Sequence, residues 1–397
     1  MGSDEPRQIP KVTLAAHRIL DGPGHVWIYA GHLHSVAGDP LAGDLVDVVN
    51  PNGRFYGRGF FNPNSKIRVR LVTFEDEPVD EAFWKKRIQQ AIRLRERVVT
   101  GTNAYRLIYG EGDRLPGLIV DRYDRMLVMQ TLSYGMDRRK ELLADILMKE
   151  MNAEAVYLRN DTKSRVLEGL PLERRFLRGG GPTQVEIHEG AAKFLVDVEQ
   201  GQKTGWFCDQ RDNRLAAAKL AAEAEVLEVF CHTGAFGIHA ALAGAVSVEG
   251  LDVSLDTLAM ARTHATMNKV ADRCSYRQAD AFEEMRKLVK AGRRYDLVIL
   301  DPPAFARSVQ ALPRALTGYK DVNILGLKLL KPEGFLVTSS CSHPVSEADL
   351  WKSIRLAARD ARREIRLIEQ RGQSADHPIL ASMPETRYLK CFIVQVL

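Results

Sequence analysis

The stretch TSSCSHP, residues 338–344, places one cysteine among small polar residues directly after a short apolar segment. Cys341 follows an expected strand over residues 334–339, and His343 stands two positions later. A cysteine in this place can be a nucleophile, a metal ligand or a small residue that fills a strand end. A nucleophile must be a thiolate, and an ordinary thiol has a pKa of roughly 8.5. A reactive Cys341 would therefore need a neighbour such as Arg307 or His343 to favour the charged form.

Carboxylates occur near the ends of two further expected strands. Glu249 and Asp252 come at the end of the second strand, where a carboxylate can accept hydrogen bonds from both hydroxyls of a ribose. Asp280 and Phe282 follow the third strand, and they could meet the amino group and the face of an adenine. Each acid also suits the cap of a helix or a turn, which is the commoner role of such residues.

A glycine-containing turn and a proline-stiffened loop follow two other apolar segments. The turn CHTGAFG, residues 231–237, lets a ligand approach the backbone but lacks the G-x-G-x-x-G spacing of dinucleotide folds, so a nicotinamide cofactor is disfavoured. The loop DPPAFARS, residues 301–308, has two prolines without amide donors that hold Asp301 extended. Asp301 and Phe305 can thus face a flat substrate. These strand ends together predict a nucleoside-bearing cofactor across the carboxyl edge of a sheet.

The part of the chain after about residue 201 alternates short apolar strands with helices. This alternation predicts an α/β domain with a parallel, doubly wound sheet. The expected strands are 226–230, 245–251, 275–278, 295–300, 334–339 and 392–396.

Two smaller domains are expected before it. Residues 10–75 are rich in turns and short strands (26–29, 45–49, 55–56 and 67–72), which predicts a small β-barrel. A small α+β middle domain follows, with helices over 81–99 and 137–151 and strands over 105–109, 117–121, 126–131 and 155–159. The stretch RGGGPTQ, residues 178–184, reads as a linker or a hairpin turn. We expect domains over residues 1–78, 79–200 and 201–397.

Composition excludes several classes of protein. The chain of 397 residues is 45% hydrophobic and 27% charged, with a net charge of +5, which is typical of a globular protein and permits a polyanion partner. Its five cysteines are scattered without a C-x-x-C pair, which favours a reducing cytoplasm over a disulfide framework or a zinc site, and no metal is expected. The start MGSDEPRQIP lacks the features of a signal peptide, and no apolar run suits a membrane helix.

One run near the N-terminus combines basic and aromatic residues. Residues 53–70 read GRFYGRGFFNPNSKIRVR, with five basic residues, four aromatic residues and no acid. Most charge runs are solvated faces of the fold. The same mixture also suits a nucleic-acid surface, because cations meet phosphates and rings stack on bases.

The chain resembles the class I S-adenosylmethionine-dependent methyltransferases. More narrowly, it resembles the bacterial 23S ribosomal RNA cytosine-C5 methyltransferases, which join a PUA-like domain, a small middle domain and a Rossmann-like catalytic domain. The resemblance covers nearly the whole chain. It rests on the stretches GHVWIYAGHL, GDLVDVV, GDRLPGLIVDRY, GQKTGWFCDQRDNR, VFCHTGAFG, DPPAFARS, TSSCSH and QSADHP.

This resemblance implies a set of residues around S-adenosylmethionine. Asp252 is expected at the ribose, with Glu249 as its competitor, Asp280 at the adenine and Asp301 near the methyl group. The other cofactor-binding residues implied are Lys203, Asp209, Gln210, Arg211, Phe230, Thr233, Gly234, Phe236 and Ala281.

The resemblance also implies a covalent mechanism. Carbon 5 of cytosine is a weak nucleophile, and a thiolate that adds to C6 activates it, so Cys341 is expected to act as the nucleophile. Asp301, protonated or through a water, could bind cytosine N3, while Pro302 and Phe305 border the base. A second cysteine found after the proline in another group of RNA cytosine-C5 methyltransferases is absent here, where Ala304 follows the two prolines. Removal of the C5 proton is therefore unassigned, with His343 or a water as candidates.

The expected partner is 23S ribosomal RNA, and the resemblance allows a homodimer. The phosphate contacts it makes plausible are Arg54, Arg58, Lys66 and Arg68. One alternative function is methylation of a guanine or adenine amino group on the same fold, which needs no thiol. Another alternative is a non-catalytic RNA-binding or ribosome-assembly factor, which the retained acids at successive strand ends disfavour.

Overall fold

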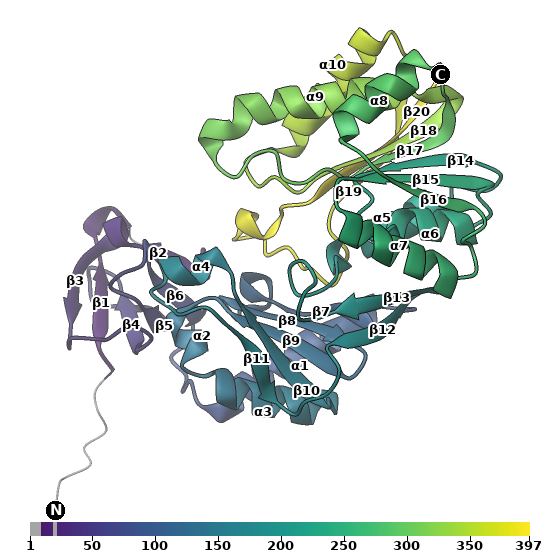
Figure 1. Ribbon diagram of the computed structural model, residues 1–397. Helices are drawn as coiled ribbons and strands as arrows, with labels where there is room; N and C mark the ends of the chain where they lie inside the picture. The colour runs from purple at the N-terminus through teal and green to yellow at the C-terminus, as the bar shows by residue number, and fades with distance from the viewer. Residues whose placement is uncertain (1–8, 19–21) are drawn as a thin grey trace, which may run out of the picture. The chain divides into compact units, whose positions relative to one another are not determined.

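A computed structural model describes residues 9–18 and 22–397, which divide into two compact units (Figure 1). Unit 1 comprises Met1–Ile187, Val196–Trp206 and Ala375–Thr386. Unit 2 comprises His188–Leu195, Phe207–Ser374 and Arg387–Leu397. The expectation about the first ten residues falls mainly on residues 1–8, outside the described part.

The N-terminal part of unit 1 is a six-stranded sheet in the order β2-β6-β5-β4-β1-β3. Its core is apolar and alternates along the strands, as a half-buried sheet requires. The predicted strand-rich module is confirmed, and β1 and β3 are additional to the strands that the sequence predicted. The strands are β1 (Lys11–Leu14), β2 (Trp27–Tyr29), β3 (Leu33–Ala37), β4 (Leu45–Val49), β5 (Phe55–Phe61) and β6 (Ile67–Thr73).

The rest of unit 1 is a five-stranded sheet, in the order β11-β10-β9-β8-β7, that packs on helices. The helix α1 (Glu81–Val98) begins at Asp80, whose side chain accepts a hydrogen bond from the amide of Phe83, as an N-cap does. The predicted helix over 137–151 is two helices, α2 (Tyr134–Asp137) and α3 (Lys140–Met151). The other elements are β7 (Ala104–Tyr109), β8 (Leu118–Tyr123), β9 (Met126–Thr131), β10 (Ala155–Asn160), α4 (Lys163–Leu167) and β11 (Glu173–Arg178).

The segment Ala375–Thr386 joins unit 1 through a buried arginine. The guanidinium of Arg95, on α1, is 1% exposed and forms two hydrogen bonds with the carboxylate of Asp113. It also donates to the carbonyl oxygens of Arg106 (2.9 Å) and Asp376 (2.7 Å). Four hydrogen bonds to fixed acceptors offset the cost of burying this charge.

A hairpin of β12 (Gln184–Glu189) and β13 (Ala192–Asp197) begins and ends in unit 1, while its central part, His188–Leu195, is assigned to unit 2. The stretch RGGGPTQ connects β11 to β12, which belong to different sheets, so it is a linker.

Unit 2 is built on a seven-stranded sheet in the order β16-β15-β14-β17-β18-β20-β19. The predicted α/β sheet is confirmed, with one correction: β20 runs antiparallel to both of its neighbours, while the five strands from β16 to β18 are parallel. The edge strand β19 was not predicted. The strands are β14 (Glu225–Val229), β15 (Ser247–Asp252), β16 (Cys274–Gln278), β17 (Tyr295–Leu300), β18 (Leu330–Ser340), β19 (Ile365–Arg371) and β20 (Lys390–Val396).

Helices cover both faces of this sheet, because successive strand residues point to opposite sides. On one face α8, α9 and α10 pack on residues such as Leu227 and Val298 (Figure 1). On the other face α5, α6 and α7 pack on residues such as Val226 and Leu297. The helices are α5 (Arg211–Ala218), α6 (Ala235–Leu242), α7 (Leu255–Met267), α8 (Ala281–Lys290), α9 (Leu312–Lys328) and α10 (Glu347–Ala361).

Among the described residues, no helix is both long enough and apolar enough to cross a membrane. The five cysteines all lie in the described part and form no disulfide.

Candidate active site

The carboxyl ends of the five parallel strands meet at one edge of the unit 2 sheet. The strand order brings to this edge, one after another, Asp280, Asp252, the turn after β14, Asp301 and Cys341. Register supports the neighbourhood of the last two, since Leu300 pairs with Thr338 in the parallel pair β17–β18. Ligands of open parallel sheets bind at this edge.

The turn after β14 has an unusual backbone. Phe230 and His232 have φ values of 64° and 50°, in the left-handed region that non-glycine residues avoid. Gly234 has φ 76°, and a Cβ there would lie 2.7 Å from the hydroxyl oxygen of Tyr276, so only glycine fits. Such strain concentrates at binding sites. The predicted residues Thr233 and Phe236 belong to this turn and to the first turn of α6.

Glu228, a residue that the sequence analysis did not single out, supports the turn from below. Its carboxylate is 2% exposed and accepts hydrogen bonds from the amides of Phe236 (3.2 Å) and Gly237 (2.9 Å). Burial raises the pKa of this carboxyl to about 8, against the lowering effect of the two amides. The available signal was a lone acid inside the apolar strand EVLEV.

Asp252 and Glu249, the two candidates for the ribose, have different surroundings. Asp252 ends β15, and its carboxylate accepts hydrogen bonds from the amides of His232 (2.9 Å) and Ser254 (3.0 Å). Glu249 lies in the middle of β15 and is held by the guanidinium of Arg277 and the hydroxyl of Tyr295. Glu249 is thus engaged, within the strand, by two side chains, whereas Asp252 lies at the carboxyl end of β15.

Asp280 is exposed and caps α8, accepting a hydrogen bond from the amide of Glu283 at 2.9 Å. One carboxylate oxygen is used by this cap, and the second remains for a ligand. Ala281 is the buried first residue of the helix.

The loop after β17 is tied to the segment before α5. The side-chain amide nitrogen of Gln210 donates to a carboxylate oxygen of Asp301 at 2.9 Å. The side-chain oxygen of Gln210 in turn accepts from the side-chain nitrogen of Asn213 at 2.7 Å. The neighbouring carboxylate of Asp209 accepts a hydrogen bond of 2.5 Å from the hydroxyl of Tyr388. Arg211 is buried and pairs with Asp212. The structure thus places Gln210, and with it the adjacent Asp209, next to the loop that carries Asp301.

The two residues expected against the substrate lie on the same loop. Pro302 is buried, and Phe305 is partly buried. The Phe305 ring lies between the rings of Tyr319 (4.7 Å between centroids) and Phe282 (6.2 Å). Part of this ring is therefore committed to packing.

Cys341 is partly exposed directly after β18, between the buried residues Ser340 and Ser342. Among the described residues, no group of three His, Cys, Asp or Glu side chains is arranged to hold a metal ion. Burial raises the pKa of Cys274 to about 11 and that of Cys391 to about 12, which disfavours the thiolate of either residue.

Five of the predicted site residues belong to unit 1 and are described separately. Lys203 is exposed and has φ 53°. In the N-terminal sheet Arg54 and Lys66 are exposed, and Arg68 is partly buried with a hydrogen bond to the carbonyl of Asn62. Arg58 differs, because it is 7% exposed and ion-paired with the carboxylates of two acids, Asp47 (2.6 Å) and Asp76 (2.8 Å). This arrangement argues against a phosphate contact for Arg58.

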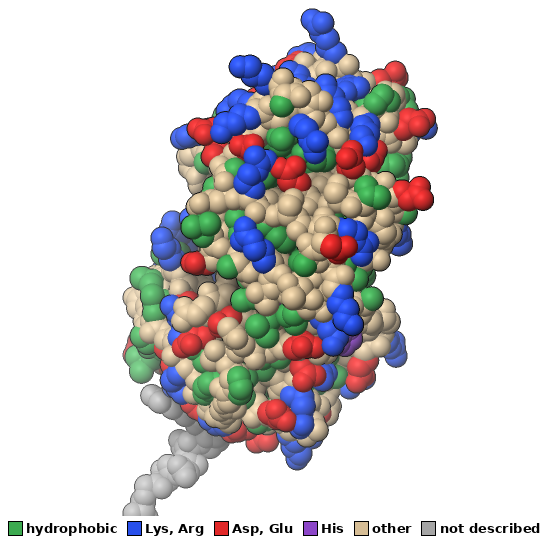
Figure 2. Space-filling view, turned by 45° about the vertical axis from the view of Figure 1, so that its right-hand side comes forward, with side chains coloured by type: hydrophobic (Ala, Val, Ile, Leu, Met, Phe, Trp, Pro, Cys, Tyr) green, Lys and Arg blue, Asp and Glu red, His purple; other side chains and the backbone are tan. Residues whose placement is uncertain are grey.

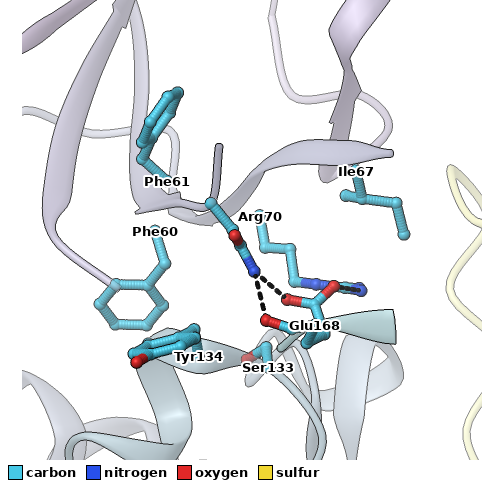
Figure 3. A pocket seen from close by; sticks show the side chains of 9 residues that line it. Phe60, Phe61, Ile67, Arg70, Ser133, Tyr134 and Glu168 are labelled. Carbon is cyan, nitrogen blue, oxygen red and sulfur yellow. Dashed lines mark hydrogen bonds and ion pairs between the residues drawn. The ribbon is translucent and has the colours of Figure 1, made fainter. Parts of the chain in front are cut away.

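Another part of the basic and aromatic run lines a small, closely packed pocket inside unit 1 (Figure 3). Glu168 lies at its base, 4% exposed, and accepts hydrogen bonds from Asn62 (3.0 Å) and Ser65 (2.6 Å). Arg70 pairs with Glu168 at 3.0 Å and with Glu111 at 3.3 Å. The cation meets two carboxylates, so this part of the run is structural. On the face drawn in Figure 2, basic and acidic side chains are interspersed.

Two stretches of the chain match known protein families. Residues 15–74 match the PUA-like domain. Residues 159–379 match the S-adenosylmethionine-dependent methyltransferase family.

Relatives and solved structures extend the match to nearly the whole chain. Proteins named ribosomal RNA large subunit methyltransferase I from Shewanella amazonensis and Alteromonas mediterranea are 42% and 41% identical, over 94% of this chain and 95% of theirs. A structure described as a methyltransferase complexed with SAH has a TM-score of 0.79 at 22% identity, covering 90% of this chain and 92% of that chain. A Streptococcus mutans protein described as a SAM-dependent methyltransferase has a TM-score of 0.80 at 20% identity, covering 97% and 100%.

The residues at the sheet edge fit S-adenosylmethionine. The carboxylates of Asp252 and Asp280 lie at the ends of adjacent strands and suit the ribose hydroxyls and the adenine amino group. The turn around Gly234 has no side chain at that residue, so a bound cofactor could approach its backbone closely. The chain is an enzyme that belongs to the S-adenosylmethionine-dependent methyltransferases, together with the ribosomal RNA large subunit methyltransferase I proteins.

Proposed function

We propose that the enzyme methylates carbon 5 of a cytosine in large-subunit ribosomal RNA and that Cys341 is its nucleophile. The substrate class follows from the names of relatives that match along 94% of the chain. The observation that carries the chemistry is the position of Cys341, one strand away from Asp301 at the edge that holds the cofactor acids. A cysteine at this place can reach a base that approaches the same edge.

The reaction then proceeds in balanced steps. The thiolate of Cys341 adds to C6 of the cytosine, and the electron pair displaced from the C5–C6 bond makes C5 nucleophilic. S-adenosylmethionine, when bound, supplies an electrophilic methyl group to C5. A base or water removes the proton from C5, and the thiolate leaves C6, which restores the aromatic ring. The base must leave its stack in the RNA to reach Cys341.

The residues around the reacting atoms have proposed roles. Asp252 holds the ribose and Asp280 the adenine amino group, while Asp301, positioned by Gln210, faces cytosine N3. The turn carries Thr233 and Phe236. The remaining proposed cofactor contacts are Lys203, Asp209, Arg211, Phe230, Gly234 and Ala281, and Pro302 and Phe305 border the base.

We assign RNA phosphates to the exposed or partly exposed basic residues of the N-terminal module, Arg54, Lys66 and Arg68. Arg58 is left out because its charge is paired inside the fold. The domain limits 1–78, 79–200 and 201–397, a cytoplasmic location and a homodimer stay predictions. Limited proteolysis, fractionation and light scattering test them.

The function is tested by incubating the protein with labelled S-adenosylmethionine and ribosomal RNA that lacks its modifications. The RNA is digested, and the labelled nucleoside is identified. We expect label in 5-methylcytidine with the wild type and with Cys274→Ala, a matched change at a partly buried cysteine at the amino end of β16, away from the carboxyl edge of the sheet. Cys341→Ala should lose it by several orders of magnitude. Label in methylated guanosine or adenosine that survives Cys341→Ala would replace the proposal by N-methylation.

A further inference from the structure

Lys390 places a positive charge inside the wall of the sheet edge that carries Cys341. It is the first residue of β20, and its Cα partner across the antiparallel pair with β18 is Ser340, the residue before Cys341. The Lys390 residue is 4% exposed. Lysine is seldom buried to this extent without an acid beside it.

The hydrogen bonds of this ammonium end at backbone carbonyls. Its Nζ donates to the carbonyl oxygen of Ser342 at 2.7 Å and to that of Tyr388 at 2.8 Å. These bonds use two of its three N–H groups. No carboxylate of the described residues forms an ion pair with it. The ammonium is therefore held by two carbonyl oxygens, one of which belongs to Ser342, the residue after Cys341, and no carboxylate neutralises its charge.

The segment that carries the thiol is fixed by its own hydrogen bonds. The hydroxyl of Tyr319, on α9, accepts from Ser340 at 2.8 Å and shares a 2.9 Å hydrogen bond with Ser342. The Ser342 hydroxyl also accepts from the amide of Ala306 at 3.1 Å. Because both neighbours of Cys341 are anchored, its position relative to Lys390 is set by the fold.

The charges of Lys390 and Cys341 are coupled. Burial lowers the pKa of Lys390 to about 8, and Cys341 is the largest influence in the opposite direction. Such coupling is mutual, so an ammonium at Lys390 lowers the pKa of the Cys341 thiol. Two further charges act on Lys390: Glu347, from α10, raises its pKa, and Arg387 lowers it. These two form an ion pair with each other, so they largely cancel.

The sequence analysis named two other residues that could favour the thiolate of Cys341, and both are exposed to solvent. Arg307 is exposed, and so is His343, whose ring stacks on Tyr388 with 5.4 Å between centroids. Solvent weakens the field of an exposed charge far more than that of a buried one. Lys390 is thus the better placed of the three.

We propose that Lys390 is a positioning residue that stabilises the thiolate of Cys341 and so prepares it to attack. The thiol proton passes to solvent, and the ammonium stays protonated at the carbonyl of Ser342, the residue after Cys341. The attack on cytosine rests on the proposed function, whereas the effect of Lys390 on the Cys341 thiolate does not. The competing view is that Lys390 merely ties Ser342 to Tyr388.

The test measures the ionisation of Cys341 without RNA or cofactor. The full chain is treated with iodoacetamide over a range of pH, and alkylation of Cys341 is followed by peptide mass spectrometry. The variants are Lys390→Met, which removes the charge, and Lys390→Arg, which keeps it. Lys352→Met is the matched control, because it makes the same change at an exposed lysine on α10.

We expect an apparent pKa of Cys341 below the ordinary value of roughly 8.5 in the wild type, in Lys390→Arg and in the control. In Lys390→Met it should rise by at least about one unit, so that alkylation at pH 7 slows about tenfold. A merely structural lysine would leave this titration unchanged.

The proposal is overturned by a wild-type pKa at or above the ordinary value, which needs no variant to fold. An equal pKa in folded Lys390→Met overturns it as well. If Lys390→Met does not fold, an ordinary Cys341 pKa in Lys390→Arg has the same consequence. Failure of the proposed function is seen separately, as a lowered pKa of Cys341 in an enzyme that does not label cytosine.

Discussion

The pocket around Glu168 and the sheet edge around Cys341 both bury charged side chains, and they differ in what faces the charge. In the pocket the carboxylate of Glu168 meets the guanidinium of Arg70 and two neutral donors, so every charge has an opposite (Figure 3). At the sheet edge the ammonium of Lys390 meets two carbonyls, and the carboxyl of Glu228 meets two backbone amides.

This difference separates structural charges from chemical ones. A buried ion pair keeps its charges in their usual forms and fixes a single arrangement of the chain. A buried group without an opposite charge keeps a perturbed pKa, which is what proton transfer and thiolate chemistry require. The first arrangement is sensitive to removal of either partner, whereas the second is sensitive to pH.

The largest effect is expected when a paired charge in the pocket loses its partner. Glu168→Ala removes the carboxylate that Arg70, Asn62 and Ser65 share and leaves Arg70 with Glu111 alone, so the free energy of unfolding should fall by about 3 kcal/mol. Urea unfolding followed by circular dichroism measures it. The matched change Glu154→Ala removes the partner of Arg125 in an exposed ion pair and should cost less than about 1 kcal/mol. Equal effects of the two changes would show that the pocket charges are not structural.

The next effect concerns the two acids of β15. Asp252→Asn removes the charge that faces the ribose and should weaken binding of S-adenosylmethionine by about 1.5–3 kcal/mol, as charged hydrogen bonds do. Glu249→Gln is the paired change, and it should leave the affinity nearly unaltered because Glu249 already holds Arg277 and Tyr295. Titration calorimetry decides between them. The reverse result would transfer the ribose to Glu249.

A smaller effect, visible only as a pH dependence, is expected at Glu228. The pKa of Glu228 is about 8 in the folded state and near the ordinary value of 4.5 in the unfolded state. Between these two pH values the carboxyl is therefore protonated in the folded protein and ionised in the unfolded one. The contribution of Glu228 to the free energy of unfolding is fully present below pH 4.5. It is lost as the pH rises towards 8, by at most about 1.4 kcal/mol per pH unit.

Glu228→Gln should remove this decline, whatever its effect at a single pH. The measurement is the slope of unfolding free energy between pH 5 and 8. Glu225→Gln, a matched change at a half-exposed residue of the same strand, should keep the wild-type slope. A slope that persists in Glu228→Gln would mean that Glu228 is ionised in the fold.

The smallest effect is expected on RNA binding by the N-terminal module. Lys66→Gln removes one exposed charge and should reduce the slope of log affinity against log salt by about one. Arg58→Gln should leave that slope unchanged and lower stability instead, because Arg58 pairs with Asp47 and Asp76. Filter binding at several salt concentrations tests both. Equal salt slopes for the wild type and Lys66→Gln would remove Lys66 from the RNA surface.

Much of the sheet edge could be predicted from sequence because local patterns define it. The strand β17 (Tyr295–Leu300) is a continuous apolar run that ends at Asp301 and two prolines, so its limits and its polar end are visible together. Asp252 and Cys341 were likewise visible, because each stands at or just after the end of an expected strand.

What the sequence concealed depends on distant partners. In the sequence, Arg58 and Arg70 look like the other basic residues of the run. In the structure each is paired with carboxylates, and Glu168, the partner of Arg70, lies 98 residues away. The edge strand β19 has no buried residue and lacks an apolar run, so it was missed. The reversed direction of β20 leaves no local mark, and Lys390 gains its meaning only from the pairing with β18.

The hydrogen bond from Arg95 to Asp376 has a consequence for synthesis of the protein. Arg95 and Asp113 emerge early, but Asp376 follows Arg95 by 281 residues. At ordinary translation rates that delay is about 14 to 56 seconds. During this time the guanidinium lacks one acceptor and the nascent N-terminal region stays incompletely closed. The ribosome that makes this enzyme must therefore add 281 residues after Arg95 before this part of the fold can be completed.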